Sequence, residues 1–424
     1  MSVSSPPSLS EACRIYLKLG CLSFGGPAAQ IALMHRLFVE ERQWLSEKQF
    51  LNALSFCLLL PGPEAMQLAT YVGWRLHGVR GGLCAGLAFI VPGALIIGLL
   101  ATLYVYYGQF LWLEGVFLGV KSAVIVIVIH ALLRVAKTAL AGALSWGIAL
   151  MAFVALFCFD VPYPLIIIAA GLIGAWALSK QPPPPTSFSL PLLSHQVKQA
   201  CLWVGLWLVP LAILFIIDAR FLQEIAQFFA LLAMVTFGGA YAVLAYMAQE
   251  AVFSYEWLTT AQMIDGLGLA ETTPGPLILV TQFVGFLAGF GTGGMMLALG
   301  TSLLVLWMTF VPCFMWIFIG SPYIDWLASR PRLVGALAGI TAAIVGVILS
   351  LSVWFGLHVF FAEVSVIRWQ GITIWQPEWM SFDSGALVIA LVAGWGLLVR
   401  HYNVITVLFL CAILGVVTRL LFGS

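Results

Sequence analysis

The sequence predicts an all-α, polytopic membrane protein with about 10–13 transmembrane helices, arranged as two inverted-topology repeats with broken helices. Three observations support this fold class: an apolar composition, long uninterrupted apolar runs and an internal duplication. Of the 424 residues, 62% are hydrophobic and 8% are charged, against roughly 45–50% and 25% in soluble domains. The composition therefore excludes an ordinary soluble fold.

Continuous apolar runs indicate that the membrane segments are helices. Residues 83–107 and 116–133 are apolar almost throughout, whereas a barrel strand alternates apolar and polar residues over about ten positions. Gly115/Gly119 and Gly335/Gly339 have the GxxxG spacing that lets helix backbones approach closely. We therefore expect closely packed membrane helices.

The chain contains an internal repeat, which is its strongest sequence signal. Four landmarks recur at a constant offset of 213 residues: Phe24-Gly25-Gly26 as Phe237-Gly238-Gly239, Trp44-Leu45 as Trp257-Leu258, Gln49 as Gln262, and Pro61-Gly62-Pro63 as Pro274-Gly275-Pro276. Further along, Val91-Pro92 matches Val311-Pro312 at an offset of 220. The offset is almost half the chain length, so the sequence is duplicated.

The repeat sets the expected domain organisation. The first repeat covers residues 1–180, a Pro-rich linker covers 181–195, and the second repeat covers 196–424. Four consecutive prolines in the linker favour an extended segment. A polar insertion at 358–383 has no counterpart in the first half, and its tryptophans predict a segment at the membrane interface.

The distribution of charge predicts that the two repeats are inverted. Residues 14–80 contain seven Lys or Arg, and the equivalent window 227–293 contains none. Because cytoplasmic loops collect Lys and Arg, the loop at 36–48 is expected in the cytoplasm and its homologue at 250–265 outside. Inverted repeats with interrupted helices are typical of secondary transporters that bind their substrate near the midplane. A duplicated structural protein is the alternative.

Matched helix breaks form the candidate substrate site. Two glycines and a proline, or a Pro-Gly-Pro, interrupt the helix at each place. Free N–H groups where a new helix starts, at Pro63 and Pro276, would bind an anion without a basic side chain. Simple kinks are the alternative. The candidate substrate-binding residues in these breaks are Phe24, Gly25, Gly26, Pro27, Pro61, Gly62, Pro63, Phe237, Gly238, Gly239, Pro274, Gly275 and Pro276.

Ionisable residues near the breaks complete the candidate site. Lys18 and Arg75 are candidates to complement an anion, although Arg75 would equally mark a cytoplasmic helix end. Glu64 and Glu271 flank the two Pro-Gly-Pro motifs and are candidate proton carriers, with helix capping as the alternative for Glu64.

The sequence lacks the signals of other functional classes. It contains no GxSxG, HExxH or GxxxxGK[ST] motif, so an enzyme is not expected. The net charge of +1 gives no footprint for nucleic acid. No cofactor or metal is expected, because the eight cysteines form no CxxC pattern and are expected to be small buried hydrophobes.

The order of these motifs resembles the chromate transporter (CHR) family in its long, duplicated form. The segments that carry the resemblance are KLGCLSFGGP, RQWLSEKQF and LLPGPEAMQLATYVGW in the first half, and TFGGAYAVL, EWLTTAQM and ETTPGPLILVTQFVGF in the second. The resemblance implies export of chromate across the bacterial inner membrane, driven by the electrochemical gradient and conferring chromate resistance. It also supports basic residues at Lys18 and Arg75. The chain departs from the pattern at Ala240, which replaces a motif proline, and at Gly93 and Cys313, which follow the paired Val-Pro steps.

We therefore expect a multi-pass transporter that holds an oxyanion between opposed helix breaks, with one repeat rocking against the other. Chromate and sulfate share charge and shape, so a carrier of sulfate or another oxyanion is an alternative. A membrane receptor or scaffold that does not transport is a further alternative. The expected partners are the oxyanion and the lipid bilayer; a homodimer stays open.

Overall fold

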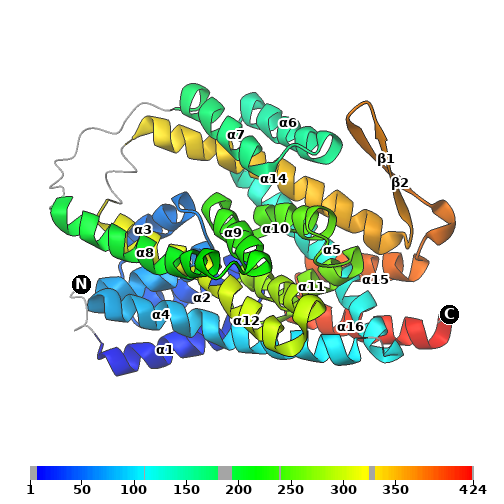
Figure 1. Ribbon diagram of the computed structural model, residues 1–424, viewed down its shortest axis with the longest axis horizontal. Coiled ribbons are helices and arrows are strands. Elements are labelled where there is room, and N and C mark those ends of the chain that lie inside the picture. Colours follow the sequence, from blue (N-terminus) through cyan, green and yellow to red (C-terminus); the bar gives the residue numbers. More distant parts are fainter. Residues whose placement is uncertain (1–6, 109, 180–192, 238–239, 324–329, 423–424) are drawn as a thin grey trace. The chain divides into compact units, whose positions relative to one another are not determined.

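A computed structural model describes residues 7–108, 110–179, 193–237, 240–323 and 330–422 (Figure 1). The α-helices are α1 (Leu9–Leu22), α2 (Gly26–His35), α3 (Glu47–Leu59), α4 (Glu64–Tyr107), α5 (Leu111–Ala139), α6 (Ala143–Phe159), α7 (Tyr163–Ala177), α8 (Leu193–Ile216), α9 (Arg220–Val235), α10 (Ala240–Gln249), α11 (Thr260–Thr272), α12 (Val280–Gly320), α14 (Pro331–Phe360), α15 (Ser384–Gly394) and α16 (Val404–Phe422). Two strands, β1 (Val364–Trp369) and β2 (Ile372–Pro377), form a hairpin.

Within the described residues, six helical segments are long and apolar enough to cross a membrane: Glu64–Tyr107, Trp112–Ala139, Val197–Ile216, Leu277–Tyr323, Pro331–Phe360 and Val404–Leu421. Shorter apolar helices lie at Ala143–Phe159, Tyr163–Ala177 and Ser384–Val399. The predicted all-α, polytopic fold class is confirmed.

The two halves of the chain form the same elements in the same order. In the first half, α1 and α2 flank one break, a π-helical turn (Arg36–Glu41) follows, and α3 and α4 flank a second break. In the second half, α9, α10, a π-helical turn (Glu250–Ser254), α11 and α12 repeat this order. The duplication seen in the sequence is therefore a duplication of structure.

Both α4 and α12 bend sharply at a glycine hinge. Gly78 has φ 62° and ψ −153°, and Gly294 has φ 72° and ψ −163°. A Cβ added to Gly73 would overlap the carbonyl of Gly81, although residues eight apart in a straight helix are about 12 Å apart. Each long helix is therefore a short half-helix followed by a longer helix that turns back along it.

The chain divides into two compact units, and each takes segments from both halves. Unit 1 consists of Met1–Leu99, Ser179–Ala240 and Thr273–Val334, and unit 2 consists of Leu100–Leu178, Tyr241–Thr272 and Gly335–Ser424. The predicted repeats, 1–180 and 196–424, are thus units of sequence that both contribute to each compact unit. Residues 181–192 of the predicted linker lie outside the described residues.

Close helix packing at the GxxxG positions is confirmed within unit 2. A Cβ on Gly119 would overlap the carbonyl of Cys411 on α16, and a Cβ on Gly339 would overlap the carbonyl of Ala170 on α7. Gly115 likewise leaves only 2.8 Å between an added Cβ and Val416 Cα. These glycines let α5 and α14 approach their neighbours at backbone distance.

The insertion at 358–383 contains the β-hairpin, which the sequence analysis did not predict. β1 and β2 pair in antiparallel register from Val364 with Pro377 to Trp369 with Ile372. Both turn residues, Gln370 and Gly371, have positive φ, as a tight two-residue hairpin turn requires.

The expectation that the cysteines are all buried hydrophobes is wrong for five of them, including Cys158, which is partly exposed. Cys13 on α1 and Cys84 on α4 form a disulfide with a Cα–Cα distance of 6.1 Å. The free cysteines Cys21 and Cys201 are exposed. Leu22 and Leu202, which follow these two cysteines in the sequence, are exposed as well.

Candidate functional site

The four predicted helix breaks lie in unit 1 or at its boundary, and they contact each other in two pairs. In the first half the breaks lie between α1 and α2 and between α3 and α4, around Gly25 and Gly62. In the second half they lie between α9 and α10 and at Pro274–Pro276, around Gly275. Gly238 and Gly239 lie outside the described residues.

Two reciprocal hydrogen bonds join the breaks of the two halves. Gly62 donates its backbone N–H to the carbonyl of Thr236 at 2.6 Å, and Gly275 donates its N–H to the carbonyl of Ser23 at 2.9 Å. Both donors and both acceptors are separated by the repeat offset of 213. A reciprocal exchange of this kind is what a two-fold axis between the repeats generates.

The local sequence explains why these carbonyls and N–H groups are available. The hydroxyls of Ser23 and Thr236 donate to the carbonyls of Leu19 and Leu232, which closes the last turns of α1 and α9. Phe24 and Phe237 then each donate N–H to the carbonyl two residues earlier, at 3.0 Å. The chain leaves both helices by the same turn, with the carbonyl of Ser23 or Thr236 directed to the other half.

Glycine is required at the centre of each Pro-Gly-Pro motif. Gly62 has φ 125° and Gly275 has φ 94°, which side-chain-bearing residues rarely adopt. A Cβ on Gly62 would lie 2.7 Å from Gln67 Nε2 and 2.8 Å from Cys313 Sγ. Because Pro61, Gly62 and Pro63 are all buried, there is no space into which a side chain could move.

Each long helix crosses the Pro-Gly-Pro motif of the other half. Gly93 on α4 packs so closely that an added Cβ would overlap the carbonyl of Pro274, and Cys313 on α12 packs against Gly62. Residues 93 and 313 are equivalent at the offset of 220. The two halves therefore differ at the helix crossing itself, where one has Gly93 and the other has Cys313.

Buried amide side chains surround the crossing. Gln30 Nε2 donates to the carbonyls of Ser23 at 3.2 Å and Gly275 at 2.7 Å, linking two breaks. Gln67 Nε2 donates to Pro61 O at 2.7 Å, and Gln282 Nε2 donates to Ala94 O at 3.0 Å. The sequence offered only a weak signal for these roles, since isolated glutamines also join helices.

The two candidate proton carriers lie in different surroundings. Glu64 is the first residue of α4, is 8% exposed, and its Oε2 has no hydrogen-bond partner among the described residues. Glu271 lies in the last turn of α11 in unit 2, is 4% exposed, and accepts a hydrogen bond from Tyr241 OH at 2.9 Å. Both carboxyl groups are therefore buried, as a protonatable membrane site requires.

Lys18 and Arg75 lie on exposed faces of unit 1. Lys18 belongs to α1, five residues before Ser23. Arg75 lies two residues before His77 at the hinge, and its Nη1 is 3.3 Å from Tyr71 OH. The structure does not bring either side chain among the buried groups of the crossing, whereas Phe24, Pro27 and Phe237 are half-buried there.

The crossing offers hydrogen-bond donors to an anion. The first N–H groups of an α-helix have no acceptor within the helix and carry the positive end of its dipole. Such groups occur at Glu64, Ala65 and Met66 at the start of the buried α4. These N–H groups lie where the sequence analysis predicted the anion site.

Comparison with known proteins places the chain in a family. Residues 10–175 and 223–416 each match the family model described as chromate transporter, and the two matches begin 213 residues apart. The chain belongs to the chromate transporter family. It therefore belongs to a family of transporters, and its duplicated form is confirmed by the second match.

Similar proteins in the chromate transporter family come from several bacteria. A probable chromate transport protein from Synechococcus elongatus is 33% identical over 82% of this chain and 85% of its own length. Chromate transport proteins from Pseudomonas aeruginosa and Cupriavidus metallidurans are 32% and 29% identical, each over 82% of this chain and over 81% and 83% of their own lengths. No solved structure matches the chain significantly.

Proposed function

We propose that this protein is a secondary active transporter that exports chromate from the bacterial cytoplasm across the inner membrane and so confers chromate resistance. The observation that carries the proposal is the reciprocal crossing of helix breaks from the two halves within unit 1. The names of the relatives support the choice of chromate. A receptor needs only one helix break to bind its ligand. A transporter that opens alternately to the two sides of the membrane uses a symmetric pair of helix breaks.

Backbone groups replace the hydration shell of the substrate in this proposal. Transfer of a bare dianion into hydrocarbon is prohibitive unless its oxygens accept new hydrogen bonds. The N–H groups at the starts of α2 and α4 would supply them, next to the amides of Gln30 and Gln67. Lys18 and Arg75, which are exposed, would attract the anion rather than bind it at the crossing.

The membrane potential is sufficient to drive this export. One elementary charge crossing 100 mV changes the free energy by about 2.3 kcal/mol, so a dianion leaving a negative interior gains about 4.6 kcal/mol. That corresponds to a concentration ratio of roughly three orders of magnitude. Glu64 and Glu271 are the proposed sites at which proton movement would couple to the anion.

Uptake of labelled chromate into inverted vesicles tests the proposal. Wild-type vesicles with an imposed potential should accumulate chromate, and excess sulfate should reveal which oxyanion is preferred. Gly62→Leu and Gly275→Leu should abolish uptake, because each introduces a side chain at positive φ in a filled site. Gly300→Leu on α12 is the matched control, since nothing lies within 4 Å of its added Cβ.

The outcomes separate the alternatives. Potential-dependent uptake that sulfate does not compete away supports chromate export. Uptake of sulfate in preference to chromate assigns the chain to a sulfate carrier. Anion binding by purified protein without uptake under any gradient contradicts transport and favours the receptor alternative.

A further inference from the structure

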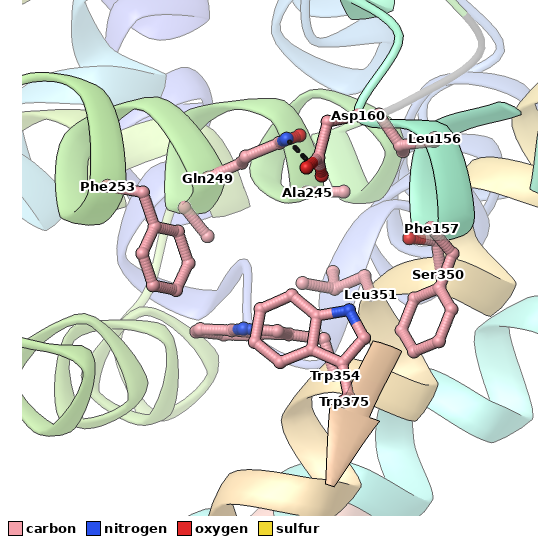
Figure 2. Close-up of a pocket in the computed structure, with 11 residues that line it drawn as sticks. Leu156, Phe157, Asp160, Ala245, Gln249, Phe253, Ser350, Leu351, Trp354 and Trp375 are labelled. Atoms are coloured by element: carbon pink, nitrogen blue, oxygen red, sulfur yellow. Dashed lines mark hydrogen bonds between the residues drawn. The ribbon is translucent and has the colours of Figure 1, made fainter. Parts of the chain in front are cut away.

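A second candidate site lies in unit 2, beside the β-hairpin. A small pocket is lined by Phe157, Asp160, Gln249, Phe253, Trp354 and Trp375. Figure 2 shows the indole rings of Trp354 and Trp375 on one side of the pocket and Asp160 with Gln249 on the opposite side. The transport proposal does not use this pocket.

Two features of the pocket, a group of aromatic rings and a carboxylate, are those of an ammonium site. The ring of Trp375 lies 6.0 Å from that of Phe157 and 5.9 Å from that of Phe253, so three aromatic rings are grouped together. Aromatic faces attract organic ammonium groups. The carboxylate of Asp160 lines the same pocket and supplies a negative charge and hydrogen-bond acceptors.

The carboxylate of Asp160 is held in position without being enclosed. Its Oδ2 accepts a hydrogen bond from Thr373 on β2, and Arg368 Nη2 approaches the same oxygen at 3.8 Å from an exposed position. Its Oδ1 has a longer contact, 3.4 Å, with Gln249 Nε2. The Asp160 side chain keeps 33% of its surface exposed, so it can still receive a cationic group.

Two hydrogen-bond donors in the pocket have no acceptor. The indole Nε1–H groups of Trp354 and Trp375 are buried and have no hydrogen-bond partner among the described residues. Trp354 is only 7% exposed. A buried donor without a partner is costly, and its position in the lining of a pocket points to an acceptor on a ligand.

The pocket lies where apolar helices end. Asp160 directly follows the apolar helix α6, and Trp354 lies in the last two turns of α14, whose apolar span ends at Phe360. Tryptophan is enriched at this depth in membrane proteins. The ligand is therefore expected at the level of lipid headgroups.

We propose that this pocket binds a phosphoethanolamine group, with its ammonium beside Asp160 and its phosphate oxygens accepting from Trp354 and Trp375. The same chemistry occurs in the headgroup of phosphatidylethanolamine and in free phosphoethanolamine. Neither an ammonium nor a phosphate alone would satisfy both sides of the pocket.

Native mass spectrometry of the full-length protein in detergent tests the lipid source. The protein is offered an equimolar mixture of phosphatidylethanolamine and phosphatidylglycerol, which lacks the ammonium. Wild type should retain phosphatidylethanolamine by about tenfold over phosphatidylglycerol, since a charged hydrogen bond is worth roughly 1.5–3 kcal/mol. Titration with free phosphoethanolamine, followed by tryptophan fluorescence, tests the soluble source.

Three variants assign the effect to the pocket. Asp160→Asn keeps an acceptor for Thr373 and should lose the preference for the amine headgroup. Trp354→Phe keeps the aromatic surface but removes the N–H, and should weaken retention of the phospholipid. Trp379→Phe is the control, because Trp379 is 79% exposed and does not line the pocket.

Several outcomes would overturn the proposal. One is a wild-type protein that shows neither preferential retention of phosphatidylethanolamine nor saturable binding of phosphoethanolamine. Another is a folded Trp354→Phe variant that retains the lipid as wild type does, a result that decides the question even if Asp160→Asn fails to fold. Preferential retention that free phosphoethanolamine does not displace identifies the lipid headgroup, and saturable binding without lipid identifies the free compound.

Discussion

Gly93 is a residue at which the two halves of the chain approach each other at backbone distance. A Cβ at this position would overlap the carbonyl of Pro274. We expect Gly93→Ala to lower the free energy of unfolding by about 1–3 kcal/mol and to reduce chromate uptake. Thermal unfolding in detergent and vesicle uptake measure the two effects, with Gly300→Ala as a control that meets no neighbouring atom. A Gly93→Ala protein with unchanged melting temperature and uptake would contradict the close crossing.

Gln30 is the side chain that links two breaks. Its Nε2 serves the carbonyls of Ser23 and Gly275, and the residue is 2% exposed. Gln30→Leu should destabilise the protein by roughly 1–3 kcal/mol, because Gly275 O loses its amide donor inside the protein. Thermal unfolding measures this, and Ala29→Leu, at an exposed position on the same helix, should be close to neutral. An unchanged melting temperature for Gln30→Leu would show that another donor replaces it.

His35 gives a pH-dependent contact outside the membrane-spanning segments. Its Nε2 lies 2.7 Å from Glu47 Oε2 and its Nδ1 lies 3.1 Å from Glu40 Oε1. The hydrogen bond to Glu47, followed by the charges of Glu47 and Glu40, raises the pKa of His35 above its ordinary value. The stabilisation is therefore fully present below about pH 6.5 and is lost as the pH rises through the higher folded-state pKa.

Melting temperatures measured across this pH range test the contact. Glu47→Gln should lower the melting temperature at acidic pH and should match wild type once His35 is neutral. The effect should be small, because these side chains are largely solvated. A difference that grows with rising pH would have the wrong sign for this pair.

At the scale of elements, substitutions at the hinge residues Gly78 and Gly294 would change backbone strain without creating a steric clash. Both residues have positive φ, and nothing lies within 4 Å of a Cβ added to either. Gly78→Val and Gly78→Asn should therefore each cost about 1–3 kcal/mol from backbone strain, because a positive φ combined with ψ −153° is a region that essentially only glycine occupies. Thermal unfolding measures both variants, with Gly205→Val in the helical α8 as the control. A Gly78→Val protein as stable as the Gly205→Val protein would contradict a strained hinge.

The positions of the breaks were predictable, and the hinges were not. Pro61, Gly62 and Pro63 remove backbone donors and free the chain to turn, so the local sequence alone predicts an interruption. Gly78 lies among several glycines, and its hinge depends on the contact of Gly73 with Gly81 across the bend. The β-hairpin was not predicted, because tryptophan is common both at the membrane interface and in β-strands, and the insertion was assigned to the interface.

The candidate site was predictable in its residues but not in its connections. The repeat offset identified Gly62 and Gly275 as equivalent, yet it does not reveal that each donates to the other half. That bond depends on packing between residues more than 170 positions apart in the chain. In the sequence, Gly93 and Cys313 are only departures from the family's motif. Their contacts with the Pro-Gly-Pro motifs arise from the helix crossing, which the sequence does not show.

At the scale of the whole molecule, the division into compact units predicts how the halves behave when separated. Unit 1 needs both halves, since Gly62 finds its acceptor at Thr236 and Gly275 finds its acceptor at Ser23. Residues 1–180 and 181–424 expressed alone should aggregate or be degraded, and their co-expression should give a complex that purifies together. Size-exclusion chromatography of each half measures this. A first half that is folded and monomeric by itself would contradict the interdependence.

The reciprocal bonds between the breaks also have a consequence for how the chain can change over generations. If two separate copies of one half made these bonds, every substitution would appear on both sides of the crossing at once. In a chain that contains both halves, each substitution changes only one side of the crossing. One half can therefore keep the small residue Gly93 while the other has Cys313 at the equivalent position. Ala240, at the position equivalent to Pro27 of the first half, is a second such divergence. Duplication within one chain thus lets two equivalent breaks diverge while each still completes the other.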